Sequence, residues 1–265
     1  METVVITGST RGVGLGLAKE FLKRNRRVVI SGRKQNVVDA AVEELSKTFD
    51  PENIFGCACN VVNFEEVRNL WVQSKKKFGT VDIWISNAGI VNSRGTTWDL
   101  DPSEIQSVID VNLTGAMYCA KVAVGGMLTQ GKGKYYNFEG FGSDGRQIQP
   151  GMTIYGATKS AIRYFTKALV KETKNTNIVV GAISPGIVVT DLLTEPYKDR
   201  PDEWKKAKKI FNILADKVDT VAPYLVDEVI ANKKPGSVIA WLTPQKAFFR
   251  FISALFVKRQ ILPSS

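Results

Sequence analysis

Two side chains on one predicted helix could exchange a proton with a bound substrate. Tyr155 and Lys159 are four positions apart, so on a helix they share a face. A free tyrosine has a pKa near ~10, and an ammonium group close to it favours the phenolate and lowers that pKa. The pair is therefore predicted to donate and accept protons near neutral pH. Because Tyr-x-x-x-Lys is also common on ordinary helices, the prediction depends on the surrounding elements.

The stretch before this pair holds the hydroxyl group that carbonyl chemistry usually needs, but the hydroxyl comes late. A predicted strand ends at residues 139–142, Glu-Gly-Phe-Gly, and Ser143 follows. We predict that Ser143 polarises a substrate carbonyl while Tyr155 donates the proton. The glycines beside Ser143 are expected to let the backbone bend and to leave room for a bulky substrate.

Short apolar runs that alternate with helical patterns must position these residues. Stretches such as 18–22 and 67–71 have the i, i+3, i+4 apolar spacing of helices. Continuous apolar strands between helices are typical of a parallel sheet covered on both faces. We predict an α/β fold in a single domain, 1–265: a doubly wound parallel sheet of about seven strands with helices on both faces. The runs are 4–7, 28–31, 54–58, 81–86, 134–138, 178–183 and 238–242.

The first strand-to-helix turn, residues 7–16, reads TGSTRGVGLG. Glycines at this place allow a tight turn and the close approach of a pyrophosphate to a helix N-terminus. The pattern predicts a dinucleotide site in which the following residues contact the cofactor: Gly8, Ser9, Thr10, Arg11, Gly12, Val13 and Gly14.

The end of the second strand indicates which dinucleotide is bound. A carboxylate there would suit the ribose hydroxyls of NAD, but the sequence has Ser31-Gly32-Arg33. Arginine suits a 2′-phosphate through its charge and its bidentate geometry. Arg11 is expected to contact the same phosphate from the other side. We therefore predict NADPH (or NADP⁺), with NAD as the less favoured alternative.

Polar and glycine residues after later strands are predicted to complete the site. Asn112 lies in a predicted helix although asparagine is a poor helix former, which indicates a specific role for its side chain. It is expected to support the turn at 87–89 or to hold a water; a tolerated polar residue is the alternative. Lys159 is expected to hold the nicotinamide ribose beside Tyr155. The other predicted cofactor contacts are Asn87, Ala88, Gly89, Pro185, Gly186, Val188 and Thr190.

Composition excludes several other classes. The chain has no histidine and three cysteines, which removes most transition-metal sites and histidine-based triads, and no metal is predicted. Unpaired buried thiols fit the interior of a cell. The 36 Lys+Arg against 26 Asp+Glu give a formal charge of +10, spread along the chain without a nucleic-acid-binding motif. Polyanionic cofactors and anionic membranes remain candidate partners; nucleic acid does not.

Two regions interrupt the alternation of strands and helices. Residues 190–219 are expected to form a substrate lid, with a plain surface helix pair as the alternative. Residues 244–265 form an apolar and basic tail, whose apolar stretch is too short for a spanning helix. The tail is expected either to bury against the sheet or a subunit, or to lie through 244–262 in a membrane interface.

Taken together, the glycine loop, the Asn87-Ala88-Gly89 turn, Asn112, Tyr155-x-x-x-Lys159 and Pro185-Gly186 resemble the short-chain dehydrogenase/reductases over nearly the whole chain. The resemblance implies a Rossmann fold, a nicotinamide cofactor and a tyrosine proton donor. It also implies a homodimer or homotetramer through the long helices that begin near 102 and 155. Asn60, where this family usually has an acid, and Val61 would contact the adenine.

A narrower resemblance is to chlorophyll(ide) b reductases, carried by residues 127–146, 155–159, 184–193 and 211–226. It implies NADPH reduction of the 7-formyl group of a tetrapyrrole, in a chloroplast if the source is a photosynthetic eukaryote and otherwise in the cytoplasm, with membrane association open. Glu139 replaces the aspartate of those reductases, and Gly140 occupies the place where most members of the short-chain family have a serine. Two alternatives remain: a reductase for another bulky hydrophobic carbonyl or sterol-like alcohol, and an NADPH-binding scaffold or sensor without turnover.

Overall fold

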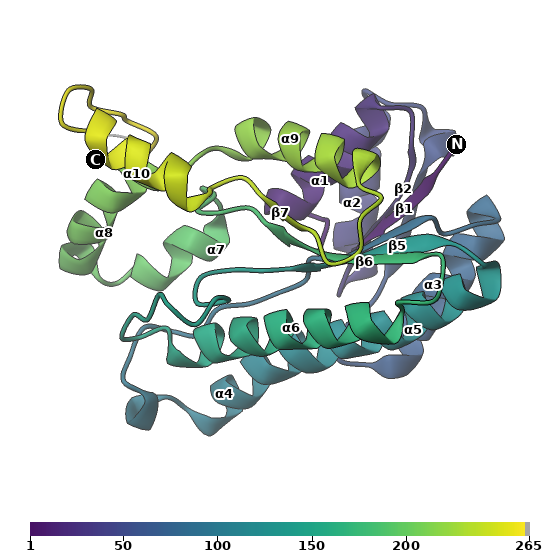
Figure 1. The fold of residues 1–265 in the computed structure, drawn as a ribbon, viewed down its shortest axis with the longest axis horizontal. Coiled ribbons are helices and arrows are strands. Elements are labelled where there is room, and N and C mark those ends of the chain that lie inside the picture. Colours follow the sequence, from purple (N-terminus) through teal and green to yellow (C-terminus); the bar gives the residue numbers. More distant parts are fainter. Residues whose placement is uncertain (263–265) are drawn as a thin grey trace.

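Seven parallel strands form one sheet in the order β3-β2-β1-β4-β5-β6-β7 in the computed structural model, which describes residues 1–262 (Figure 1). This confirms the predicted doubly wound sheet. Each of the seven predicted apolar runs overlaps one strand. Their bounds are β1 Thr3–Ile6, β2 Arg27–Gly32, β3 Ile54–Ala58, β4 Ile83–Ser86, β5 Gly133–Phe138, β6 Ile178–Ser184 and β7 Val238–Ala240.

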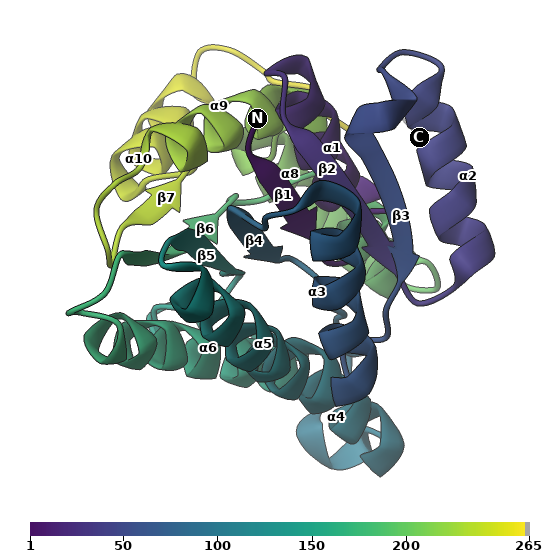
Figure 2. The same ribbon diagram turned by 90° about the vertical axis from the view of Figure 1, so that its right-hand side faces the viewer.

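Helices cover both faces of the sheet, and each face has its own apolar core (Figure 2). On one face lie α1 (Gly12–Lys23), α2 (Gln35–Ser46) and α9 (Val218–Ala231). On the other lie α3 (Phe64–Phe78), α5 (Gly115–Gln130) and α6 (Thr153–Glu172). All four side chains of β1 are buried, because a central strand of a parallel sheet is covered from both sides.

The long helix between β4 and β5 contains a π-helical segment at a predicted site residue. Helix α4 (Pro102–Ile109) continues through a π-helical segment, Asp110–Thr114, into α5. Such single π turns inside α-helices are frequent at functional sites. Asn112 lies within this segment and is buried.

The segment after β6 forms a separate helical layer. It contains α7 (Asp191–Thr194), a 3-10 turn (Glu195–Tyr197) and α8 (Pro201–Leu214). Tyr197, Trp204 and Phe211 pack their rings together, with centroids 5.5–6.0 Å apart, and Arg94 lies 4.6 Å over the Tyr197 ring. The loop after β4 is therefore tied to this segment. Whether the segment acts as a lid stays a prediction.

The C-terminal helix α10 (Pro244–Ser253) packs against α8 and not against the sheet (Figure 1). Of the expected alternatives for the tail, burial of its phenylalanines against the sheet is wrong, because these side chains are exposed. Contact with a subunit or with a membrane stays a prediction. Short 3-10 turns at Pro51–Asn53 and Thr97–Asp99 complete the described elements.

Within residues 1–262, none of the helices combines the length and the apolar character needed to cross a bilayer. The same residues contain no cluster of three or more metal-ligating acidic or cysteine side chains. Cys57, Cys59 and Cys119 are buried free thiols.

Candidate active site

The predicted site residues lie at one edge of the sheet. Because all seven strands are parallel, the loops that follow β1 to β6 leave the sheet at the same edge. The glycine loop follows β1, Arg33 follows β2, Asn60 follows β3, and the later groups follow β4, β5 and β6. The topology therefore brings together residues that are up to 180 positions apart in the chain, such as Arg11 and Asp191.

Two side chains hold the glycine loop in place. Ser9 is fully buried; its hydroxyl donates to Ile6 O at 2.7 Å and accepts from Ser31 N–H at 2.9 Å. The Asn87 amide donates to Thr7 O and Gly8 O, both at 2.9 Å. The loop is thus bonded to the ends of β2 and β4.

Gly8 shows why this loop needs glycine. Its φ is +64°, a left-handed conformation, and a Cβ atom there would lie 2.9 Å from Ala88 Cα. Any side chain would both strain the backbone and push the loop away from β4. Helix α1 begins at Gly12 immediately after the loop, and no described side chain caps its first turn. Free backbone N–H groups at such an end suit an anionic phosphate.

The two arginines predicted to contact a 2′-phosphate are both at the surface of this edge. Arg33 is exposed directly after β2. Arg11 lies 3.2 Å from Asp191, and both side chains are largely exposed. Exposed ion pairs of this kind contribute little stability, so this pair can open at small cost. Thr10 packs on Gly32, where a Cβ would lie 2.8 Å from its methyl group.

The loops after β3 and β6 flank these groups. Asn60 donates its backbone N–H to Glu66 at 2.8 Å, and the buried Val61 side chain packs on Gly115 of α5. After β6, Val188 is buried, and the Cβ position of Gly12 lies 3.5 Å from the Thr190 methyl group. Pro185 and Gly186 directly follow β6 and precede both of these residues in the chain.

Tyr155 and Lys159 lie on the first two turns of α6, and both are buried. The Lys159 ammonium is 5.6 Å from the centre of the Tyr155 ring and donates to Phe138 O at 3.1 Å. Helical spacing thus places the two groups together, as predicted. The end of β5 supplies the backbone carbonyl that holds the lysine.

Burial, more than the charge of the lysine, sets the ionisation of this pair. Burial raises the pKa of Tyr155 to about 12, which is the opposite of the expected lowering. Burial also lowers the pKa of Lys159 to about 8, while the negative charge of Glu139 acts to raise it. At neutral pH the phenol is therefore protonated, and most of the lysine is an ammonium.

Asn112 fixes the loop that follows the 87–89 turn. Its amide donates to Ile90 O at 2.9 Å, and its oxygen accepts from Ile90 N–H at 2.8 Å. The same amide also approaches the Thr158 hydroxyl, at 3.2 Å. A Cβ on Gly89 would lie 3.3 Å from the Asn112 oxygen and 3.7 Å from Lys159 Nζ. Asn112 therefore joins the end of β4 to the helix that carries Tyr155.

Gly140 lies next to both hydroxyl groups of the predicted catalytic set. A Cβ atom at Gly140 would lie 2.3 Å from Tyr155 Oη and 3.1 Å from its Cζ. The backbone N–H of Gly140 donates to Ser143 Oγ at 2.9 Å. Covalent geometry limits the distance between the two hydroxyl oxygens to about 8 Å at most. Both hydroxyls thus lie beside the same glycine.

The glycines beside Ser143 meet one of the two expectations. Gly142 has a φ of +84°, so the backbone does bend beside Ser143 in a conformation that favours glycine. The expectation of room for a substrate is wrong at Gly140, because the hydroxyl of Tyr155 fills the space beside that residue. Because Ser143 accepts from Gly140 N–H, its own O–H remains available as a donor.

Glu139 is a group whose role the sequence did not reveal. It is 5% exposed, and its Oε1 has no hydrogen-bond partner among the described residues; Arg163 Nε is 3.6 Å away. Burial raises the pKa of Glu139, and the charge of Arg163 opposes that shift. The available signal was an acid at the end of an apolar strand, next to the catalytic loop.

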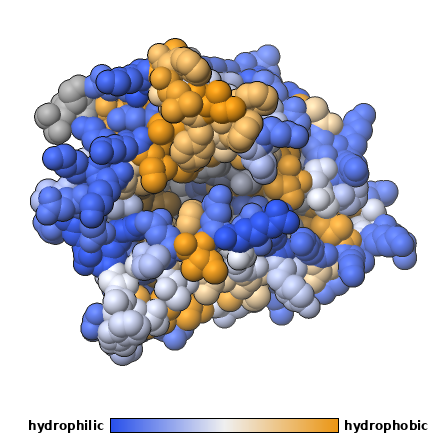
Figure 3. All heavy atoms as spheres, turned by 60° about the vertical axis from the view of Figure 1, so that its left-hand side comes forward, coloured by the Kyte–Doolittle hydropathy of each residue, from blue (hydrophilic) through white to orange (hydrophobic). Residues whose placement is uncertain are grey.

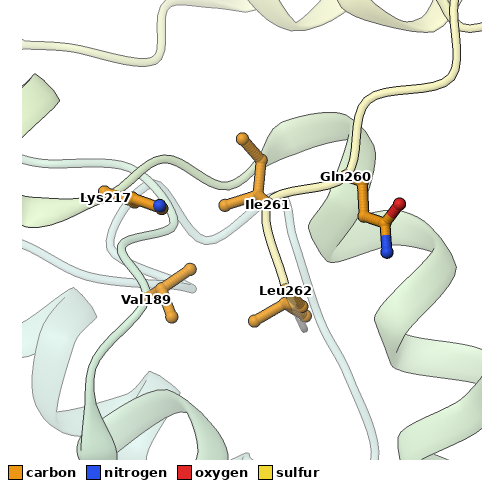
Figure 4. A pocket seen from close by; sticks show the side chains of 5 residues that line it. All are labelled: Val189, Lys217, Gln260, Ile261 and Leu262. Carbon is orange, nitrogen blue, oxygen red and sulfur yellow. The ribbon is translucent and has the colours of Figure 1, made fainter. Parts of the chain in front are cut away.

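Two cavities lie beside this site. One, of about 290 Å³, is lined by residues of α6 and β7 and by Glu139. The other, of about 550 Å³, lies between the loop after β6, the start of α9 and the tail. In it Val189 and Leu262 point towards each other, whereas Gln260 points away (Figure 4). Neither is lined by Tyr155 or Lys159.

Known proteins are similar to this chain in both sequence and fold. Residues 2–201 match the family model "short chain dehydrogenase". Chlorophyll(ide) b reductase NOL, chloroplastic, of Arabidopsis thaliana is 38% identical over 259 residues, which cover 94% of this chain and 72% of that protein. A 3alpha-hydroxysteroid dehydrogenase of Mediterraneibacter gnavus is 33% identical over 192 residues, which cover 72% of this chain and 76% of that protein.

Solved structures agree with the fold. A 3-ketoacyl-(acyl-carrier-protein) reductase from Brucella melitensis complexed with NADH has a TM-score of 0.80 at 24% identity, covering 92% of this chain and 98% of that chain. ElxO with NADP bound has a TM-score of 0.79 at 26% identity, covering 90% of this chain and 96% of that chain.

Proposed function

Because this chain belongs to the short-chain dehydrogenase/reductase family, whose members act on C–OH and C=O groups, we propose that it reduces the 7-formyl group of a chlorophyll(ide) b-type tetrapyrrole with NADPH. The product is the 7-hydroxymethyl compound. The observation that carries the proposal is that Tyr155 Oη and Ser143 Oγ both lie next to Gly140. Two hydroxyl donors next to the same residue suit an oxygen that gains negative charge during reduction.

The residues present fit a nicotinamide dinucleotide. When bound, NADPH supplies the hydride for the carbonyl carbon. The uncapped start of α1 and the side-chain-free backbone at Gly8 suit the pyrophosphate. Arg33, with Arg11 once it leaves Asp191, suits the 2′-phosphate. The loops after β3, β4 and β6 would hold the rest through Asn60, Val61, Asn87, Ala88, Gly89, Pro185, Gly186, Val188 and Thr190.

Side chains of this protein then donate the proton to the substrate oxygen. Tyr155, with a pKa of about 12, keeps its proton at neutral pH and can give it to the substrate oxygen. Ser143 donates its free O–H to the same oxygen and so orients the carbonyl. The Lys159 ammonium stays beside the ring and stabilises the phenolate as it forms. Asn112 keeps the loop after β4 in register with α6.

The choice of substrate rests on the named relatives and on the surface of this chain. The plant relative is a chlorophyll(ide) b reductase, and its similarity to this chain covers 94% of the chain. A flat apolar macrocycle also suits a protein with an aromatic helical layer in the segment that follows β6. A second candidate is a bulky hydroxysteroid or ketone, favoured by the 3alpha-hydroxysteroid dehydrogenase relative.

A stopped assay with NADPH and chlorophyllide b tests the proposal. We expect loss of the formyl absorption band and formation of the hydroxymethyl product, with Tyr155→Phe as the inactive control. If chlorophyllide b is inert while apolar ketones or steroids oxidise NADPH, the second candidate replaces the first. Tight NADPH binding without turnover of any carbonyl would instead support a scaffold or sensor.

The preference for NADPH has its own test. Arg33→Ala removes a charged group at the end of β2 and is expected to lower kcat/KM for NADPH by about 10- to 100-fold, the usual effect of losing a charge-assisted hydrogen bond. The value for NADH should stay within about twofold. Lys34→Ala, which changes the next exposed cation, is the matched control. An equal loss with both cofactors would remove Arg33 from the 2′-phosphate site.

We further propose a homodimer or homotetramer through α5 and α6. Leu128 on α5 and Tyr164 on α6 are exposed, at 48% and 77%, although both helices cover the sheet. Light scattering of the purified protein tests this. A single monomeric species at micromolar concentration would contradict it.

A further inference from the structure

The tail is attached to the protein by its charged face. Arg250 on α10 lies 2.7 Å from Asp216 and donates to Leu214 O at 2.7 Å; its side chain is only 14% exposed. Arg259, after the helix, lies 2.7 Å from the other Asp216 oxygen. Trp241 Nε1 also donates to Asp216, at 2.6 Å. One buried carboxylate therefore binds three groups and fixes which side of α10 faces inward.

The opposite side of the tail is apolar and exposed. We call it the apolar face; its side chains are 41–83% exposed. Figure 3 shows these hydrophobic side chains gathered at one end of the molecule. The apolar face consists of Phe248, Phe249, Phe251, Ile252, Leu255, Phe256 and Val257.

This orientation is the reverse of an ordinary surface helix. A helix on a soluble core buries its apolar stripe and exposes its charges. Here the arginine is inside and the phenylalanines are outside, and Thr243 caps the helix by accepting from Lys246 N–H at 3.2 Å. Contiguous exposed apolar surface of this kind marks an interaction site.

Charge decides between two occupants of the apolar face. Exposed lysines lie on α8, against which α10 packs, at Lys205, Lys206 and Lys209, and Lys258 follows the apolar face directly. In a two-fold contact with a second copy, each patch meets itself, so these lysines would approach one another. Anionic lipid headgroups would instead attract these lysines.

We propose that the apolar face docks on an anionic lipid bilayer, with α10 lying in the headgroup region. An amphipathic helix with bulky apolar side chains and flanking lysines binds in this way, parallel to the surface. The described helices are too short or too polar to span a bilayer, so the contact is peripheral. The proposal goes beyond the reaction and needs no turnover, so its failure and that of the proposed function are distinguishable.

Vesicle flotation of the full chain tests this surface. Wild-type protein is expected to float with vesicles of phosphatidylglycerol and phosphatidylcholine, and to float less with phosphatidylcholine alone. A Phe248→Ser/Phe249→Ser/Phe256→Ser variant removes three phenylalanines that are 61–83% exposed, so its fold should be unchanged. Its partitioning onto anionic vesicles should fall at least about tenfold.

A matched variant, Val37→Ser/Val72→Ser/Trp98→Ser, removes three exposed apolar side chains elsewhere and should float like wild type. Thermal melting checks that both variants are folded. Equal flotation of all three proteins, or no flotation of wild type, would overturn the proposal. If the phenylalanine variant instead changes the oligomeric state and wild type does not bind vesicles, the apolar face is an interface between copies.

Discussion

The start of α6 and the C-terminal tail both bury polar groups, but only the tail exposes a continuous apolar surface. At the start of α6, a phenol and an ammonium are buried, and their pKa values shift because water is excluded. In the tail, an arginine is turned inward to a carboxylate and the phenylalanines face the solvent. The first arrangement suits proton transfer inside the protein. The second suits a contact outside it.

The comparison implies that each region can be disabled without the other. Changes near Tyr155 should alter turnover and leave vesicle binding intact. Changes in the apolar face should weaken vesicle binding and leave the turnover of a soluble substrate intact. The following changes test that separation, with the largest expected effect first.

Tyr155→Phe removes the proton donor and keeps the ring. Loss of a general acid of this kind costs about 10²–10⁴ in rate. We expect kcat to fall by about 10³, with NADPH affinity measured by fluorescence and vesicle flotation both unchanged. Residual activity within tenfold of wild type would assign the proton to another group.

Gly140→Ser restores the residue that the short-chain family usually has, yet it should harm this enzyme. The new Cβ would lie 2.3 Å from Tyr155 Oη, so the ring must move away from its place beside Lys159. Overpacking of this kind destabilises the fold by about 1–3 kcal/mol. Because the proton donor is displaced as well, we expect kcat to fall by roughly 10- to 100-fold. Gly140→Ala should have a similar effect, because the Cβ and not the hydroxyl is at fault.

Gly125→Ser is the control for a glycine change, since nothing lies within 4 Å of a Cβ there. It should keep wild-type kcat. A Gly140→Ser variant that is faster than wild type would show that position 140 is open to a catalytic hydroxyl.

The pH profile gives a smaller effect. Burial lowers the pKa of Lys159 to about 8, so its side chain is an ammonium below that pH. We therefore expect kcat to be level below about pH 8 and to fall as the pH rises through that value. Tyr155, at about 12, stays protonated over this range. A profile of kcat against pH from 6 to 10 measures this.

Glu139→Gln sharpens the same test. It removes a negative charge that raises the pKa of Lys159, so the alkaline limb should move to lower pH. Glu203→Gln, an exposed acid on α8, is the control and should leave the limb in place. A limb that does not move in Glu139→Gln would show that the two groups are not coupled.

Much of the fold was predictable because buried parallel strands leave continuous apolar runs. The strands 54–58 and 178–183 are found with bounds within one residue of those expected. Asn112 was identified because asparagine is costly in a helix, and its two bonds to Ile90 supply the reason. The apolar runs predicted the strands, and helix propensity pointed to Asn112.

The rest depended on contacts that sequence spacing does not encode. The fit between Gly140 and Tyr155 joins residues 15 positions apart through a loop whose path the sequence leaves open. The pKa of Tyr155 followed burial, which a pair of neighbouring residue types does not reveal. Which side of α10 faces inward depends on Asp216, whose bonds to Arg250 and Arg259 form only in the folded chain.

The central claim is that Ser143 supplies the hydroxyl missing from position 140. The most direct measurement is kcat for NADPH-dependent reduction of the formyl substrate by Ser143→Ala, compared with wild type. Loss of one donor to a developing oxyanion typically costs about 10²–10³ in kcat, and we predict a fall of that size with NADPH affinity unchanged. A Ser143→Ala enzyme as fast as wild type would contradict the account.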